Sequence, residues 1–430
     1  MPKRTPPRPP ARRSRPLATA RRRRPDAPPT VAGSPASAAL AAADELELEI
    51  EKLVAGGDGL GRWRSIPILV PRAAPGDRLR VRLVERRASF ARAEIVEILR
   101  PGPGRREPPC PHFAACGGCD LQHLDEPTQL RAKSAATLET LRWMSRTEVP
   151  APRAIVAGAP FGYRLRTQVH LVAGADGVAV GYHERGSRRL VPVTACPILE
   201  PALERVVVGL GRQLRAPVPS RVDLARGDGG EVAAAPPLPE LPGGELVRRV
   251  GGFDYRFDAR CFFQGHAGLL DRLVEIVIGD AAGELAFDLY AGVGLFALPL
   301  ARRYRRVVAV EGDRIAARYA GKNARAARAA RAGQLEIVSR AVESWAPAGL
   351  VAGADRVVVD PPRDGLPPAL RRLLAARPPA RLTYVSCHAA ALARDLAELA
   401  AVFAVESLVF VDLFPQTGHM ESIVQLVRRS

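Results

Sequence analysis

The sequence predicts an α/β fold for the 430-residue chain, with a Rossmann-like domain at its C-terminal end. Two observations lead to this prediction. From about residue 259, short apolar runs typical of buried strands alternate with helix-like segments, which implies an open, largely parallel sheet. Earlier in the chain, residues 45–103 contain several short strand-like segments separated by Gly and Pro, as in a small β-barrel. We therefore divide the chain into 1–44, 45–103, 104–258 and 259–430.

Residues 1–44 form a low-complexity tail rich in Pro, Arg, Ala and Ser, including the run RRRRP that ends at Pro25. Such a segment cannot bury enough apolar surface to fold, so we expect it to be disordered. Two interpretations of its arginines stay open. They make non-specific contacts with nucleic-acid phosphates, or the tail is solvated and has no role.

The charge balance favours a polyanionic partner. The chain has 63 Lys and Arg against 45 Asp and Glu, a formal net charge of +18, which points most simply to nucleic acid. A compositional bias toward Arg would give the same charge. The first residues lack the apolar segment of a signal peptide, and no apolar run approaches the roughly 20 residues of a membrane helix. We expect a cytoplasmic protein without membrane contact or an obligate protein partner.

The segment 45–103 shows the alternation of half-buried strands. LELEIEKL alternates apolar and charged residues, and IPILV, DRLRVRLVER and ARAEIVEIL continue the pattern between turns. The glycines of GGDGLGRW suit a tight loop between the first two strands. The predicted exposed faces carry many arginines.

The segment 104–258 combines strand-like stretches with a cysteine cluster in CPHFAACGGCDLQH. Three cysteines lie in this short loop, and a fourth candidate follows in TACPIL; together they are Cys110, Cys116, Cys119 and Cys196. Tetrathiolate sites hold zinc or an iron–sulfur cluster. Three close cysteines with a distant fourth favour [4Fe–4S], while zinc and free thiols stay open. Cys261, in RCFFQGH, has no metal-like neighbours in the sequence.

The first candidate site of the C-terminal part is FDLYAGVGLF. A strand ends near Asp288, and Gly292 and Gly294 form the turn into a helix, where the backbone can approach a ligand closely. About twenty residues on, Glu311 ends the next strand, where a carboxylate can accept hydrogen bonds from ribose hydroxyls. A plain strand–helix turn would look similar without Glu311. The acid before the turn and the missing third glycine favour S-adenosylmethionine over NAD.

Three further segments carry reactive side chains at strand boundaries. VVVDPPRDGL places Asp360 before two prolines that stiffen a loop, which could hold a carboxylate beside a flat base. TYVSCHAAALARDL places Cys387 where a strand gives way to a helix, and a helix N-terminus is expected to lower the pKa of a thiol. FPQTGHMES places His419 and Glu421 before the last strand, where Glu421 could act as a general base. Taken singly, each segment also has a purely structural explanation. Asp360 could lie in a rigid turn, Cys387 could be a small buried hydrophobic residue, and Glu421 could be one exposed acid among many.

Together and in order, CFFQGH, FDLYAGVGLF, VVVDPPR, TYVSC and FPQTGHME resemble the RNA (uracil-5-)-methyltransferase family over most of the chain after residue 45. The resemblance implies that 45–103 is a TRAM domain, an OB-type RNA-binding module. It also implies that the cysteine loop holds the [4Fe–4S] cluster of members that act on 23S ribosomal RNA. The combination of both resembles the uracil-1939 type, with an unstacked uridine as substrate.

The resemblance also assigns roles to individual residues. It implies that Cys387 is the nucleophile that adds to the uracil ring, that Glu421 is the base, and that Asp360 lies between cofactor and target base. It implies a set of contacts with S-adenosylmethionine, made by Gln264, Asp288, Tyr290, Gly292, Gly294, Glu311 and Asp360. The cluster ligands would be the four cysteines named above.

The sequence departs from the family pattern at several positions. His266 and Ala291 replace the usual Asn and Cys, and His388-Ala389 replaces the Asn-Pro that usually follows the nucleophile. Leu295 and Ala341 stand where some relatives have a cofactor-binding Asn. Two alternatives stay open: the same chemistry on tRNA, which the cysteine loop disfavours, and a non-catalytic RNA-binding protein with a decayed cofactor site. An iron–sulfur redox enzyme is disfavoured because no segment resembles a flavin or nicotinamide site.

Overall fold

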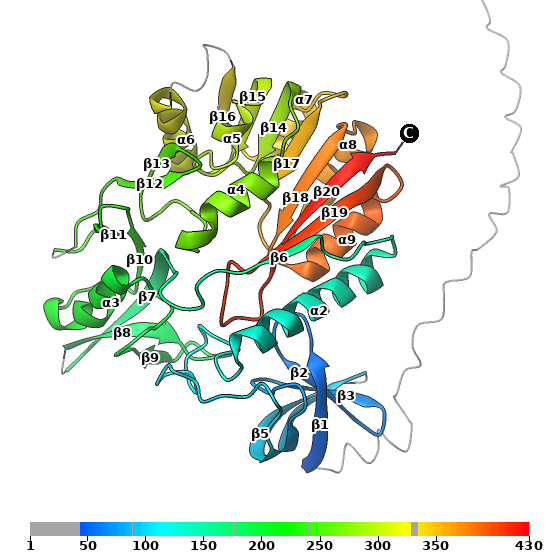
Figure 1. Ribbon diagram of the computed structural model, residues 1–430. Coiled ribbons are helices and arrows are strands. Elements are labelled where there is room, and N and C mark those ends of the chain that lie inside the picture. Colours follow the sequence, from blue (N-terminus) through cyan, green and yellow to red (C-terminus); the bar gives the residue numbers. More distant parts are fainter. Residues whose placement is uncertain (1–43, 88, 176, 240, 328–333, 430) are drawn as a thin grey trace, which may run out of the picture.

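A computed structural model describes residues 44–429 except 88, 176, 240 and 328–333. The tail that we predict to be disordered lies, apart from Asp44, outside the described residues. Three strand-rich bodies follow one another along the chain (Figure 1). No helix among the residues that the structure describes is long and apolar enough to cross a membrane.

The C-terminal body contains an eight-stranded sheet in the order β16-β15-β14-β17-β18-β20-β19-β6. Its strands are β14 (Gly283–Leu289), β15 (Tyr304–Glu311), β16 (Leu335–Ser339), β17 (Arg356–Val359), β18 (Arg381–Ser386), β20 (Glu421–Arg428), β19 (Phe403–Val411) and β6 (Ala154–Val156). The pairs from β16 to β18 are parallel, whereas β20 runs antiparallel to both β18 and β19. The Rossmann-like prediction is confirmed, with an antiparallel edge.

Helices cover both faces of this sheet, as the alternation of strands and helices predicts. On one face, α4 (Leu270–Ile278), α5 (Ala297–Leu300) and α6 (Arg314–Ala326) pack in one core cluster. On the other, α7 (Val342–Gly349), α8 (Pro368–Ala376) and α9 (Ala389–Leu399) pack in a second. The chain runs outward from β14 to β16 and then returns to β17 on the other side of β14. This change of direction creates the switch point at which open α/β sheets bind ligands.

The N-terminal body is a closed barrel in the order β1-β2-β3-β5-β4. Its strands are β1 (Glu45–Leu53), β2 (Gly59–Trp63), β3 (Ile66–Val70), β4 (Arg78–Arg86) and β5 (Ala91–Arg100). Buried and exposed residues alternate along β1, because successive side chains of a strand point to opposite faces. The predicted barrel is therefore present.

The arginines on the barrel surface are paired with glutamates. Arg78 and Arg82 on β4 contact Glu47 and Glu45 on β1 at 3.1 and 3.2 Å, and Arg80 contacts Glu97 on β5 at 2.5 Å. The glutamates of β1, which alternate with apolar residues in LELEIEKL, thus neutralise much of the positive charge of the neighbouring strand β4.

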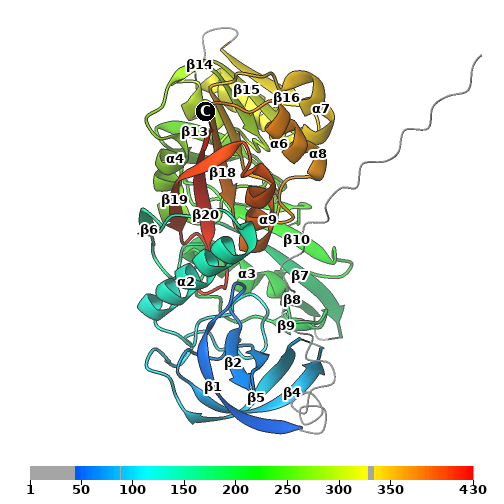
Figure 2. The ribbon, with the colours of Figure 1, turned by 90° about the vertical axis from the view of Figure 1, so that its right-hand side faces the viewer.

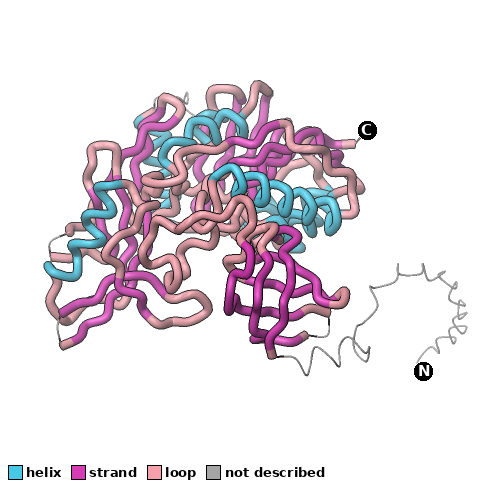
Figure 3. The backbone as a smooth tube through the Cα atoms, turned by 60° about the horizontal axis from the view of Figure 1, so that its bottom comes forward, coloured by secondary structure: helices cyan, strands magenta, loops and turns pink. Residues whose placement is uncertain are grey.

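The middle body contains an antiparallel sheet, β11-β10-β7-β8-β9, which we call the central sheet. Its strands are β7 (Arg166–Gly174), β8 (Gly177–His183), β9 (Leu190–Pro192), β10 (Arg221–Arg226) and β11 (Val232–Ala235), and α3 (Pro201–Gln213) covers one face. The hairpin β12 (Leu246–Val250) and β13 (Phe253–Phe257) leads on to the C-terminal body. Figure 3 shows the central sheet and the barrel as separate strand groups on either side of a loop-rich region.

A long helix that the sequence did not reveal, α2 (Glu126–Ser145), lies between the barrel and the large sheet (Figure 2). Its N-cap is Asp125, whose side chain accepts a 2.8 Å hydrogen bond from the backbone N–H of Thr128. The helix contacts β1 of the barrel and α9 of the C-terminal body. It buries polar residues such as Gln129 and Lys133, so its apolar periodicity is weak.

Candidate active site

The predicted cofactor residues meet at the switch point. β14 pairs with both β15 and β17, so Asp288, Glu311 and Asp360 come from three neighbouring strands at one edge of the sheet. Glu311 braces the glycine turn: one of its oxygens accepts a 2.7 Å hydrogen bond from the N–H of Gly292 and the other from the N–H of Asp313. Gly292 and Gly294 have φ angles of 56° and 92°, a region in which a side chain would be strained.

Tyr290 adopts the same left-handed conformation without being glycine, with φ at 65°. Bulky residues rarely do so, and such strain concentrates at functional sites. Its hydroxyl donates a 2.7 Å hydrogen bond to Glu343. Burial raises the pKa of Tyr290, and this hydrogen bond raises it further.

Buried acids dominate the site. Asp288 is fully buried, and its carboxylate makes no well-formed hydrogen bond with the described residues. Burial raises the pKa of Asp288 well above its usual range, and the charges of Asp360 and Glu311 raise it further. Burial also raises the pKa of Asp360 to about 7.

The side-chain amide of Gln264 has one atom paired and one unpaired. Its N–H donates a 3.0 Å hydrogen bond to Asp360, whereas its buried carbonyl oxygen has no hydrogen-bond partner among the described residues. A buried acceptor of this kind is costly unless a ligand N–H or O–H satisfies it. These donors and acceptors fit a polar nucleoside ligand at the switch point.

The predicted nucleophile and base lie side by side. β18 and β20 are antiparallel with Ser386 opposite Ser422, so Cys387 and Glu421 flank this pair at the same edge of the sheet. Burial, and after it the charge of the neighbouring Glu421, raises the pKa of Cys387 to about 11. Burial and the charge of Asp360 likewise raise the pKa of Glu421 well above its usual range.

Our expectation of a lowered pKa for Cys387 is therefore wrong for this structure. Cys387 does precede α9, but His388 occupies the N-cap and its ring Nδ1 accepts a 3.2 Å hydrogen bond from the N–H of Ala391. Desolvation and a carboxylate outweigh the helix dipole, whose effect is small and short-ranged.

One cation that our sequence analysis missed counters the acids. Arg363, three residues after Asp360, lies with its guanidinium 3.3 Å from Nε2 of His419. Its charge lowers the pKa of both Cys387 and Glu421. Its position within VVVDPPRDGL could have suggested a role, because the rigid prolines fix the direction of the following residue.

The loop before Glu421 is held by the segment that carries the cysteines. The carbonyl of Gln416 accepts hydrogen bonds from the N–H groups of Asp120 and Leu121 at 2.8 and 3.0 Å. The Asp120 carboxylate accepts a 3.0 Å hydrogen bond from the N–H of Gly418. On α2, Lys133 forms a buried 2.6 Å ion pair with Asp412. These contacts join segments almost 300 residues apart, so no local motif reveals them.

The four predicted cluster cysteines line one cavity of about 400 Å³, which also reaches Arg363 and His419. Burial raises the pKa of Cys116, Cys119 and Cys196, and the charge of the nearby Arg164 opposes this shift in all three. Sγ of Cys116 accepts a 3.3 Å hydrogen bond from the N–H of Gly118. As they stand, no three His, Cys, Asp or Glu side chains within the described ranges form a group that could hold a metal ion.

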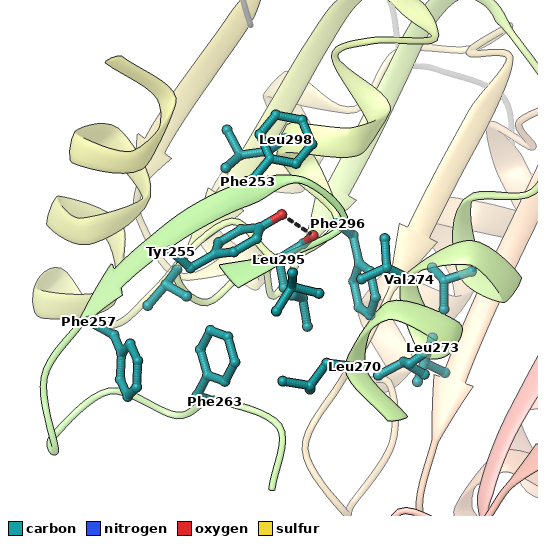
Figure 4. Packing of buried hydrophobic residues seen from close by; sticks show 14 of the residues in the cluster. Phe253, Tyr255, Phe257, Phe263, Leu270, Leu273, Val274, Leu295, Phe296 and Leu298 are labelled. Atoms are coloured by element: carbon teal, nitrogen blue, oxygen red, sulfur yellow. Dashed lines mark hydrogen bonds between the residues drawn. The ribbon is translucent and has the colours of Figure 1, made fainter. Parts of the chain in front are cut away.

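Two departures from the family pattern point away from the site. Leu295 lies in the hydrophobic core, and its carbonyl accepts a 2.9 Å hydrogen bond from the hydroxyl of Tyr255 (Figure 4). His266 is buried and stacked on Tyr163, with ring centres 4.7 Å apart. The third, Ala341, is exposed at the start of α7 and offers no polar side-chain atom.

Fold and site together define a Rossmann-like enzyme with a nucleoside-ligand site at the switch point, beside a paired cysteine and glutamate. A sequence model described as tRNA (Uracil-5-)-methyltransferase matches residues 352–429. The chain is 33% identical to the 23S rRNA (uracil(1939)-C(5))-methyltransferase RlmD of Chromohalobacter salexigens, over 89% of each chain. It is 31% identical to RlmD of Alkalilimnicola ehrlichii, over 90% of this chain and 97% of the relative.

A solved structure has a similar fold. The tRNA (uracil-54, C5)-methyltransferase of Pyrococcus abyssi, in complex with S-adenosyl-L-homocysteine, has a TM-score of 0.69 and 25% identity. The match covers 88% of this chain and 100% of that one. The chain thus belongs to the RNA (uracil-5-)-methyltransferase family and is an S-adenosylmethionine-dependent enzyme.

Proposed function

We propose that this enzyme methylates carbon 5 of one uridine in 23S ribosomal RNA, the equivalent of uracil 1939, through a covalent cysteine adduct. The observation that carries the chemistry is the placement of Cys387 beside Glu421 on adjacent strands, next to Asp360. The substrate rests on the relatives named RlmD, whose alignments cover 89% and 90% of the chain.

The proposed reaction begins with Cys387. As a thiolate, its sulfur adds to carbon 6 of the uracil, which leaves electron density on carbon 5, and covalent catalysis thereby replaces one difficult step with two easier ones. S-adenosylmethionine, when bound, supplies an electrophilic methyl group. Glu421 then accepts the proton that carbon 5 releases. The electron pair of that C–H bond forms the ring double bond again, and the bond to sulfur breaks.

The environment suits these roles. A raised pKa makes Glu421 a stronger proton acceptor than an exposed carboxylate. The positive charge of Arg363 stabilises the ionised forms of both Glu421 and Cys387. Asp360 would orient the base by hydrogen bonding, and Gln264, Asp288, Tyr290, Gly292, Gly294 and Glu311 would hold the cofactor. The target uridine must be unstacked to enter, so a loop or single strand is the expected substrate.

We also propose that Cys110, Cys116, Cys119 and Cys196 hold a [4Fe–4S] cluster. The support is an all-sulfur donor set on one cavity with arginines around it, which suits an anionic cluster. The methylation needs no electron transfer, so the cluster would keep the loop in place. Anaerobically purified protein should contain iron and absorb near ~400 nm. Zinc without iron would identify a zinc site instead.

The proposed division of the chain is 1–44, 45–103, 104–258 and 259–430. In this division the barrel would be the TRAM module, and the partner of the enzyme would be 23S RNA.

Mass spectrometry of ribosomal RNA from the host with and without the gene tests substrate and reaction together. Loss of one 5-methyluridine from 23S RNA supports the proposal, and complementation by a Cys387→Ser variant should not restore it. Loss from tRNA alone would contradict the substrate and keep the chemistry. No change in either RNA would refute the proposal once a redundant enzyme is excluded.

A further inference from the structure

The face of the central sheet opposite α3 carries a pair of stacked histidines. Along β7, Val169 and Leu171 are buried on the α3 side, whereas Gln168 and His170 alternate with them and point to the other face. The rings of His170 and His183 lie parallel, with centres 3.7 Å apart and planes at 17°. Both side chains are partly exposed, so the outer ring surface is available to another flat group.

An arginine lies beside this histidine pair. Arg221 on β10 is directly opposite His170 on β7 and is exposed. Burial lowers the pKa of His170, and the neighbouring His183 and Arg221 lower it further. Among the residues that the structure describes, neither Arg221 nor His170 has a carboxylate partner, since Asp223 is hydrogen-bonded to Gln168 at 2.8 Å. The barrel arginines differ, because glutamates neutralise them.

The same face extends to the cysteine cavity, which Arg363 of the active site also lines. Toward the C-terminal body, the guanidinium of Arg166 lies 5.5 Å from the ring centre of Phe262, which is 58% exposed. Arg166, Gln168 and Phe262 line the cavity that also contains Arg363 and His419. His170 is four residues further along β7, about 13 Å from Arg166 at the rise of a strand. A strand that enters the active site across this face would place a flanking nucleotide at the histidines.

We propose that the outer face of the central sheet binds single-stranded RNA beside the target uridine, with a flanking base stacked on the His170–His183 pair and a phosphate at Arg221. Aromatic platforms next to cationic side chains are how proteins hold unpaired RNA. The inference rests on the proposed function, because it extends the substrate from one uridine to its neighbours. It adds a contact that local sequence patterns do not reveal, since His170 and His183 belong to different strands.

The test compares single variants on the two faces of the sheet. The probe is a labelled RNA oligonucleotide that spans the uridine of 23S RNA whose methylation is lost in the gene deletion, with S-adenosylhomocysteine present. His170→Ala and His183→Ala should each raise the Kd and the KM for this RNA about fivefold or more, while kcat stays unchanged. His170→Phe, which keeps a flat ring, should recover most of the affinity. Arg221→Ala should reduce the slope of log Kd against log salt by about one ion.

The matched control is Arg205→Ala, an exposed arginine on α3 at the opposite face. Unchanged RNA affinity in both histidine variants would overturn the proposal, and so would an equal loss in the Arg205→Ala variant or no recovery with His170→Phe. If the wild-type enzyme methylates no uridine, the proposed function fails. The binding measurement, repeated on a 23S RNA fragment, would still decide whether this face contacts RNA.

Discussion

The active site and the cysteine cavity are neighbouring groups of buried ionisable side chains with opposite surroundings. In the active site, burial raises the pKa of Asp288, Asp360 and Glu421, and the charge of Asp360 raises that of Asp288 and Glu421 further. Arg363 is a cation that lowers the pKa of Cys387 and Glu421. In the cysteine cavity, burial raises the pKa of Cys116, and three arginines oppose this shift; they are Arg72, Arg164 and Arg185. A group of neighbouring carboxyl groups suits proton transfer during turnover, whereas thiols with arginines nearby suit a bound anion.

The two regions are also connected. The segment after Cys119 holds the loop that leads to Glu421 through Asp120 and Gln416. Gln416 is fully buried and has a positive φ of 67°, a conformation that its hydrogen bonds maintain. The cysteine region can therefore act on catalysis by position alone. The following changes separate chemistry, metal binding and positioning.

The largest expected effect is on turnover in the Cys387→Ser variant. A serine hydroxyl is a far weaker nucleophile at neutral pH, so kcat should fall by several orders of magnitude while RNA and cofactor binding persist. Single-turnover methylation assays and binding titrations measure the two properties. Cys261→Ala is the control, because Cys261 is packed in a hydrophobic core cluster and is not among the residues that line the cysteine cavity, so this variant should retain activity. Full activity in Cys387→Ser would rule out the covalent route.

Glu421→Gln should stop the reaction after methyl transfer. Loss of a general base typically reduces rates about 10²- to 10⁴-fold. Because the proton on carbon 5 would remain, the bond between sulfur and RNA should persist as a complex that survives denaturing gel electrophoresis. The double variant Cys387→Ser/Glu421→Gln should give no such band. Absence of the band in the single variant as well would argue for another base.

Cys196→Ser tests the other region. We expect loss of iron and of the absorbance near ~400 nm, together with a lower Tm, since bound metal stabilises the folded state. The Cys261→Ala protein should keep both the metal and the Tm. A Cys196→Ser protein that retains all its iron would exclude this residue as a ligand.

Strand-end reasoning brought the reactive residues together correctly but missed what surrounds them. Asp360, Cys387 and Glu421 each adjoin a strand end, and the carboxyl edge of a sheet collects such residues. The pKa of Cys387 is raised first by the burial of the thiol itself and then by the charge of Glu421, and no sequence pattern contains either effect. Helix α2 was missed because its buried face contains polar residues. Gln129 and Lys133 are buried there and form hydrogen bonds with Gln416 and Asp412, which are distant in the sequence. Its polar residues masked the usual apolar periodicity.

Lys133→Met tests the connection between the regions. Removing the lysine leaves Asp412 buried without its partner, which should cost about 3–5 kcal/mol in the free energy of unfolding. Lys133→Met/Asp412→Leu should recover much of that loss. The exposed pair Lys52–Glu139 is the control, where Lys52→Met should cost about 1 kcal/mol or less. Urea denaturation measures all three, and equal losses for the buried and exposed pairs would contradict the expectation.

The smallest effect concerns Arg363 and the pH at which Cys387 ionises. Arg363 favours the thiolate, so Arg363→Met should raise the pKa of Cys387 above its value of about 11. A thiol with a higher pKa has less thiolate at any given pH below it. Alkylation of Cys387 at pH 8 should then be slower, because a pKa higher by one leaves about tenfold less thiolate. Peptide mass spectrometry after timed iodoacetamide treatment follows this residue alone. Arg363→Lys retains the positive charge and should stay closer to wild type, whereas identical alkylation profiles for Arg363→Met and wild type would show that the guanidinium does not reach the sulfur.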